Sequence, residues 1–118
     1  MAGSYKELIV WQKAMSLVEE VYRIAKNLPR EETYVLSDQM KRAAVSIPSN
    51  IAEGHVRKTI KEYVNFLSIA RGSNAELQTQ MIICHRLGYI DKEQMEKALG
   101  LSDEVREDAS GDHSKTDT

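Results

Sequence analysis

The sequence predicts an all-α protein, an antiparallel up-down-up-down four-helix bundle with a short or frayed fourth helix. Apolar residues recur at helical steps of three and four over long stretches, and no stretch alternates as a strand would. Only two prolines and six glycines interrupt the 118 residues. Each stretch between two predicted helices is short, which places consecutive helices antiparallel to each other.

The first helix is expected to run from a capping box at Ser4 and Glu7 to a stop at Pro29. It carries two apolar stripes, where a small bundle needs only one broad stripe. The second stripe is therefore a first indication of oligomerisation. The stripes are Leu8, Trp11, Met15, Val18, Tyr22 and Ala25, and Val10, Ala14, Leu17, Val21, Ile24 and Leu28.

The second helix is expected to begin between Thr33 and Ser37 and to end at Gly54, a glycine after the last turn. Pro48 lies inside it and lacks the amide that would bond to the Ala44 carbonyl, so we expect a kink or a local break. The core stripe of this helix is Leu36, Met40, Ala43, Ile47 and Ile51.

The third helix is expected to run from a capping box at Thr59 and Glu62 to about Leu87. Its apolar seam is Ile60, Tyr63, Leu67, Ala70, Asn74, Leu77, Met81 and Cys84, a spacing typical of coiled-coil-like packing. The segment 71–76, RGSNAE, interrupts this seam. Either the helix breaks at Gly72, or it continues and Gly72 and Ser73 let another helix approach closely. We favour the continuous helix.

The fourth helix opens with a capping box at Asp91 and Gln94 but has the weakest pattern. After Ser102 only Val105 and Ala109 are apolar. We therefore expect this helix to be short or frayed, with the bundle occupying residues 1–109 and a disordered polar tail occupying residues 110–118.

The composition indicates one soluble domain, with 42% hydrophobic and 29% charged residues. Cys84 is the single cysteine, which excludes an internal disulfide and is typical of a reducing cytoplasm. No run of about 18 apolar residues predicts a membrane span, and the N-terminus lacks the pattern of a signal peptide. We expect a cytoplasmic protein without a membrane partner.

The sequence offers little for metal binding or catalysis. Cys84 and His85 are adjacent, so on a helix they point about 100° apart and do not easily share a metal. The helical carboxylates Glu53, Glu62 and Glu76 have no convergent histidine or nucleophile. We expect no metal site, no cofactor and no catalytic residue, and hence a protein that is not an enzyme.

A polar face interrupts the second helix. Arg42, Ser46, Asn50 and Glu53 follow at spacings of four, four and three, which places them on one side of a helix. Across a helix pair they could meet Ser73, Asn74 and Glu76. We favour a hydrogen-bonded network that fixes register, within the subunit or between subunits, over a ligand or RNA site.

The charge distribution leaves room for a local basic patch. The net charge is −2, but residues 103–118 carry six acids and two bases, so the rest of the chain is mildly basic. The candidate nucleic-acid-binding residues are Lys41, Arg57, Lys58, Lys61 and Arg71. We expect phosphates to be contacted mainly by three of them, which lie around the turn that opens the third helix: Arg57, Lys58 and Lys61. On one subunit a solvated helix end is the simpler interpretation, whereas repetition by symmetry would add phosphate contacts.

Three segments together resemble a known family. They are residues 11–14 (WQKA), residues 39–54 (QMKRAAVSIPSNIAEG) and residues 66–76 (FLSIARGSNAE). They are similar to the four-helix-bundle proteins encoded in bacterial 23S ribosomal RNA intervening sequences, over about residues 5–99. The polar stretch after Ser102 departs from the family pattern, which has further apolar positions there.

The resemblance implies a compact antiparallel bundle that assembles as a homopentamer, with RNA binding as the role proposed for the family. Related accessory proteins of diversity-generating retroelements form similar pentamers that bind nucleic acid and a reverse transcriptase. Two hypotheses result. The first is a non-enzymatic oligomeric bundle that binds structured RNA or other nucleic acid through basic residues repeated by symmetry. The second is a protein-interaction scaffold or accessory subunit without a direct nucleic-acid role.

Overall fold

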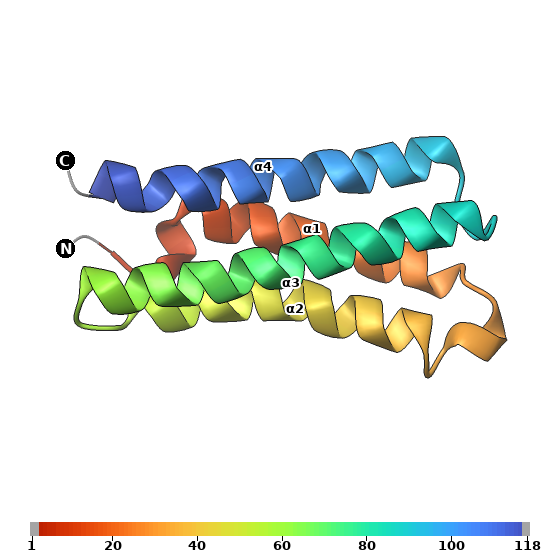
Figure 1. The fold of residues 1–118 in the computed structure, drawn as a ribbon, viewed down its shortest axis with the longest axis horizontal. Helices are drawn as coiled ribbons and strands as arrows, with labels where there is room; N and C mark the ends of the chain where they lie inside the picture. The colour runs from red at the N-terminus through yellow and green to blue at the C-terminus, as the bar shows by residue number, and fades with distance from the viewer. Residues whose placement is uncertain (1–2, 117–118) are drawn as a thin grey trace.

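The chain folds into four long helices in a computed structural model that describes the backbone of residues 3–116 and the side chains of residues 3–110 (Figure 1). The helices are α1 (Ile9–Lys26), α2 (Leu36–His55), α3 (Ile60–Arg86) and α4 (Lys92–Thr116). Two short 3-10 helices, η1 (Tyr5–Glu7) and η2 (Arg30–Glu32), precede α1 and α2. The described residues contain no strand, and none of their helices is both long and apolar enough to cross a membrane.

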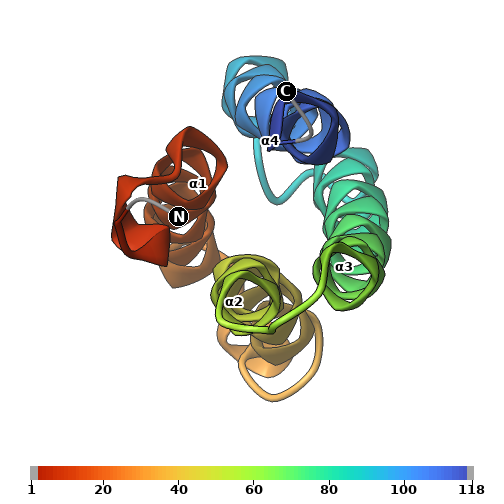
Figure 2. The same cartoon turned by 90° about the vertical axis from the view of Figure 1, so that its left-hand side faces the viewer.

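The helices form an antiparallel up-down-up-down bundle of 45 × 24 × 19 Å, as predicted. Each helix packs against the next one in the chain, and α4 closes the ring against α1. Seen from the end, the four helices surround one common interior (Figure 2). The α2–α3 turn lies at the same end of the bundle as the beginning of α1 (Figure 1).

The interior is built from one stripe of each helix. The predicted stripe on α2 is buried throughout, and every member of the α3 seam is buried except Ile60, which is 48% exposed. On α1 the stripe that begins at Val10 forms the core. The other stripe is only partly covered, and Trp11 and Val18 pack on the edge of the core.

Two of the three predicted capping boxes open an α-helix. The Thr59 hydroxyl accepts from the Glu62 amide at 3.1 Å, and Asp91 and Gln94 bond reciprocally to each other's backbone amides at 2.7 and 3.0 Å. Ser4 is different, because it caps only η1. Leu8 has an extended backbone conformation, which separates η1 from α1. Helix α1 therefore begins at Ile9, and the prediction that the first helix begins at Ser4 is wrong.

Helix α2 continues past both residues that were expected to disturb it. It runs through Pro48 without a break. It also passes Gly54 and ends at His55, so the expectation that Gly54 ends the helix is wrong. Gly54 is instead a point of close approach between helices. A Cβ built on it would lie 2.7 Å from the Cβ of Phe66 on α3 and 3.1 Å from Cδ1 of Tyr63.

Helix α3 is continuous through Gly72, as favoured above. Helix α4 is longer than the short or frayed helix predicted, since it passes Gly100 and reaches Thr116. Its buried residues Ala98, Ser102, Val105 and Ala109 recur at steps of four, three and four. These small side chains form a stripe that a search for large apolar residues overlooks. The predicted disorder of residues 110–118 stays a prediction, because the side chains after Ser110 lie outside the described residues.

Candidate nucleic-acid interface and the polar contacts between helices

Part of the predicted polar network joins α2 to α3. The Ser46 and Ser73 hydroxyl oxygens lie 2.8 Å apart, across the two helices. The Asn50 amide donates to the Ser46 carbonyl at 2.8 Å and to its hydroxyl at 3.0 Å. Ser46, Asn50 and Ser73 therefore form one half-buried cluster, as the face on α2 predicted.

The charged members of that face do not join the cluster. Arg42 donates to Asp38 on its own helix at 2.9 Å, and its side chain is 80% exposed. Glu53 pairs with Arg57, one turn later, and Glu76 accepts from Gln80 at 3.3 Å. Each of these charges thus has a partner four residues away in the chain, so the contact between α2 and α3 consists of the neutral groups of Ser46, Asn50 and Ser73.

Asn74 belongs to a second network, between α3 and α4. Its amide nitrogen donates to the Ser102 carbonyl at 2.9 Å, and the Ser102 hydroxyl donates to the Asn74 side-chain oxygen at 2.6 Å. Gln78 also donates to the Ser102 hydroxyl, at 2.7 Å. The sequence did not predict that Ser102 and Gln78 belong to a polar contact between helices. The signal for Ser102 was its place between Ala98 and Val105 at helical spacing.

Three of the basic candidates gather at the turn between α2 and α3. Arg57 and Lys58 lie in the turn, and Lys61 lies in the first turn of α3. Lys58 and Lys61 are exposed, and neither has an acidic partner within 4 Å among the described side chains. Arg57 is engaged on both sides, since it pairs with Glu53 and its guanidinium lies 4.8 Å from the centre of the Phe66 ring.

The other two basic candidates lie elsewhere. The Lys41 ammonium sits 5.2 Å from the centre of the Tyr22 ring, on the side of α2 that faces α1. Lys41 precedes Arg57 by 16 residues, about 24 Å along a helix. Arg71 is exposed on α3 beside Arg106 of α4. The five candidates therefore do not form one patch on the subunit.

The described side chains hold no cluster suited to metal binding, since no three His, Cys, Asp or Glu residues converge. Cys84 is buried, with its sulfur 3.4 Å from the Met40 sulfur. Burial, with a smaller contribution from Glu32, raises the pKa of the Cys84 thiol to about 11. A thiol with that pKa stays protonated near neutral pH and is a poor nucleophile.

Residues 6–111 match the family described as 23S rRNA-intervening sequence protein, which is almost the whole bundle. The chain belongs to this family. No curated protein matches the sequence. The family assignment and the four-helix architecture thus agree with the resemblance seen in the three sequence motifs.

One solved structure shows how the intervening-sequence protein compares with another member of this fold. It is the crystal structure of a protein of unknown function from the S23 ribosomal protein family of Bacteroides thetaiotaomicron. The TM-score is 0.79 at 26% sequence identity, over 86% of this chain and 94% of that chain. The two chains therefore share the bundle over nearly their full lengths.

Proposed function

We propose that this intervening-sequence protein is a non-enzymatic bundle that binds structured RNA, or another nucleic acid, at the turn between α2 and α3. The observation that carries the proposal is the pair Lys58 and Lys61, two exposed cations next to the N-terminus of α3 with no carboxylate partner among the described side chains. Unpaired cations are free to contact phosphates, and a helix N-terminus adds favourable backbone dipoles.

Arg57 supports the same site in a different way. Its stacking on Phe66 and its pairing with Glu53 hold the guanidinium at the edge of the turn. A fixed guanidinium positions a phosphate, whereas Lys58 and Lys61 supply mobile charge. Lys41 and Arg71 would add contacts only if a long nucleic acid or several subunits bring them together.

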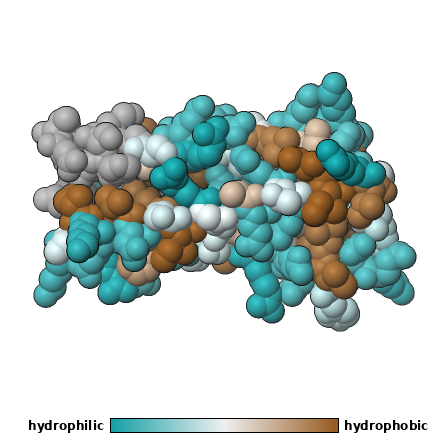
Figure 3. Space-filling view, viewed as in Figure 1, coloured by the Kyte–Doolittle hydropathy of each residue, from teal (hydrophilic) through white to brown (hydrophobic). Residues whose placement is uncertain are grey.

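We also propose that the protein is a homo-oligomer, a pentamer by family resemblance, which multiplies a small basic site. Apolar side chains gather at both ends of the face that carries α3 (Figure 3). The exposed large apolar residues of α3 are Ile60, Val64, Ile69, Ile82 and Ile83, and the exposed Leu87 directly follows the helix. So many exposed apolar side chains on one helix support a contact with another subunit. The family description, 23S rRNA-intervening sequence protein, agrees with an RNA-related role.

Binding is tested with a structured RNA hairpin and a DNA duplex of the same length by fluorescence anisotropy at several salt concentrations. The affinity should fall steeply as salt rises, because phosphate contacts release counterions. The double variant Lys58→Glu/Lys61→Glu should abolish binding at low salt. The matched control, Arg86→Glu/Lys92→Glu, reverses two exposed charges at the opposite end of the bundle and should bind almost normally. An affinity that does not change with salt concentration, or an equal loss of affinity in both double variants, would contradict the proposal.

A scaffold for another protein is the second candidate function, and the partly covered stripe of α1 favours it. Charge reversal at Arg57 and Lys58 would then leave partner binding intact. The binding measurement on the unchanged protein distinguishes the candidates, because a scaffold without a nucleic-acid role would bind neither the hairpin nor the duplex at low salt.

A further inference from the structure

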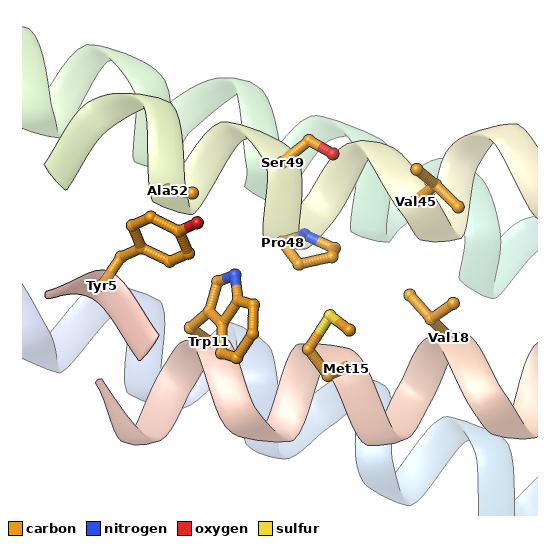
Figure 4. A pocket seen from close by; sticks show the side chains of 8 residues that line it. All are labelled: Tyr5, Trp11, Met15, Val18, Val45, Pro48, Ser49 and Ala52. Atoms are coloured by element: carbon orange, nitrogen blue, oxygen red, sulfur yellow. The ribbon is translucent and has the colours of Figure 1, made fainter. Parts of the chain in front are cut away.

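A groove runs along the outside of the bundle between α1 and α2 (Figure 4). It has a volume of about 350 Å³. The α1 side presents Trp11, Met15 and Val18, and Tyr5 of η1 packs edge-on against Trp11 with the ring centres 5.4 Å apart. The α2 side is lower, because its lining residues are Val45, Pro48, Ser49 and Ala52. A ridge of large side chains thus stands beside a floor of small ones.

The groove continues into a second hollow with a different character. This hollow has a volume of about 430 Å³, shares Val45 with the first, and is lined by Tyr22, Asp38, Lys41, Arg42 and Ser46. The Asp38 carboxylate is engaged by Arg42 at 2.9 Å. The Lys41 ammonium lies over the Tyr22 ring and has no carboxylate within 4 Å among the described side chains. One positive charge is therefore left over at this end.

We propose that this groove docks an amphipathic helix of a partner protein, with apolar anchors on the Trp11 side and acidic residues at Lys41. Tryptophan and tyrosine in an open groove are typical anchors of protein interfaces. The small side chains of α2 leave room for a third helix to lie along the first two. The leftover charge at Lys41 selects an acidic segment, so the charge pattern of the occupant complements that of the groove.

The structure also fixes the spacing within that partner helix. Lys41 and Pro48 are seven residues apart on α2, about 10 Å along the helix axis. A helix that lies along α2 therefore needs its acidic residues about seven positions from its apolar anchors, on the same face. This surface differs from the basic turn at Lys58 and Lys61, so the inference goes beyond nucleic-acid binding.

The test uses the only tryptophan of the chain, Trp11, which lies in the groove. The probes are synthetic amphipathic peptides of about 18 residues, with leucine and phenylalanine anchors and with glutamates about seven positions before or after them. Matched peptides carry lysine in place of each glutamate. One glutamate peptide should shift the Trp11 emission to shorter wavelength with saturation, and its lysine counterpart should bind about tenfold more weakly.

Three variants make the result specific. Ser49→Arg places a long side chain on the groove floor at an exposed position and should abolish the shift while leaving binding of the RNA hairpin unchanged. Lys41→Glu should reverse the preference, so that the lysine peptide binds better. Arg86→Glu, at the far end of α3, should change neither.

Three outcomes would overturn the proposal. The first is the absence of any emission shift with all the peptides, and the second is equal binding of the glutamate and lysine peptides. The third is an emission that changes on dilution of the protein alone, because that would show that a second copy of the chain covers the groove.

Discussion

Asn74 on α3 and Ser102 on α4 exchange two hydrogen bonds inside the bundle, and each residue is almost completely buried. The contact uses the backbone carbonyl of Ser102 as well as its hydroxyl, so it fixes the axial position of α4 against α3. A shift of α4 by one residue would leave a buried amide without a partner, which costs more than the bonds contribute.

Ser102→Ala should lower the free energy of unfolding by about 1–3 kcal/mol, because the Asn74 oxygen and the Gln78 amide both lose a buried partner. Urea unfolding followed by circular dichroism measures the loss. Ser68→Ala, an exposed serine on α3, is the matched control and should change stability little. An equal loss of stability in the two variants would show that the buried contact between Asn74 and Ser102 does not stabilise the bundle.

The double variant Asn74→Leu/Ser102→Ala should lower the free energy of unfolding by less than the sum of the two single changes, since both partners are removed.

The length of α4 is the main feature of the fold that the sequence did not predict. Long apolar stripes predicted the first three helices, and the short stretches between helices predicted the antiparallel arrangement. The length of α4 was missed because its buried stripe consists of Ala98, Ser102, Val105 and Ala109, which add little apolar surface. Ser102 is a polar residue, and it can be buried in the core because Asn74 on α3 forms hydrogen bonds with it. Its burial therefore depends on how α3 and α4 pack together and cannot be predicted from the sequence of either helix alone.

Gly54→Ala should destabilise the bundle by about 1–3 kcal/mol, although alanine favours helices more than glycine does. The new methyl group would meet the Cβ of Phe66 at 2.7 Å, so α2 and α3 would have to move apart. Thermal unfolding measures the change.

Gly72→Ala is the matched control on α3, since a Cβ there would have no described atom of another helix within 4 Å. It should stabilise an isolated subunit by about 0.5–1 kcal/mol through helix propensity. The two substitutions are chemically identical, so opposite signs would show that packing, and not backbone conformation, explains Gly54. Destabilisation by Gly72→Ala that appears only in an oligomer would place Gly72 in a subunit contact.

The polar face on α2 was predicted in part. The spacing of Ser46 and Asn50 correctly placed them toward Ser73, since helical periodicity fixes which residues share a face. It could not foresee which partner each long side chain would take. Arg42 and Glu53 each pair with an opposite charge four residues away on the same stretch of chain. Such a local ion pair loses less side-chain conformational entropy than an ion pair between two helices.

The free energy of unfolding should fall as the pH rises from about 8.5 to 11. The Cys84 thiol in the folded protein has a pKa of about 11 because it is buried, whereas an unfolded thiol ionises near pH 8.5. Above pH 8.5 the unfolded state therefore loses its proton first and is favoured, by about 3 kcal/mol at pH 11. Below pH 8 this group should leave stability independent of pH. Urea unfolding at a series of pH values measures the slope.

Two variants separate the groups that contribute to that slope. The Tyr89 hydroxyl donates to Glu32 at 2.8 Å, which raises the pKa of Tyr89, so this group acts in the same direction above its ordinary range. Tyr89→Phe should remove only the part of the slope above pH 10. Cys84→Ala should lower stability at all pH values through the cavity it leaves, yet flatten the decline that begins near pH 8.5. An unchanged decline in Cys84→Ala would show that other groups cause it.

Asn50→Leu should alter the oligomeric state more than the helix content, if the face shared by α2 and α3 meets another subunit. Asn50 is half-buried beside the Ser46–Ser73 contact, and its amide is held within α2, so the fold of the subunit does not depend on it alone. Neutral polar groups at a subunit contact set register and partner choice more than they add stability. Light scattering measures the mass, and circular dichroism measures the helix content. Glu107→Leu adds the same side chain at an exposed position of α4 and should leave the mass unchanged. An unchanged mass in Asn50→Leu would exclude Asn50 from the contact between subunits.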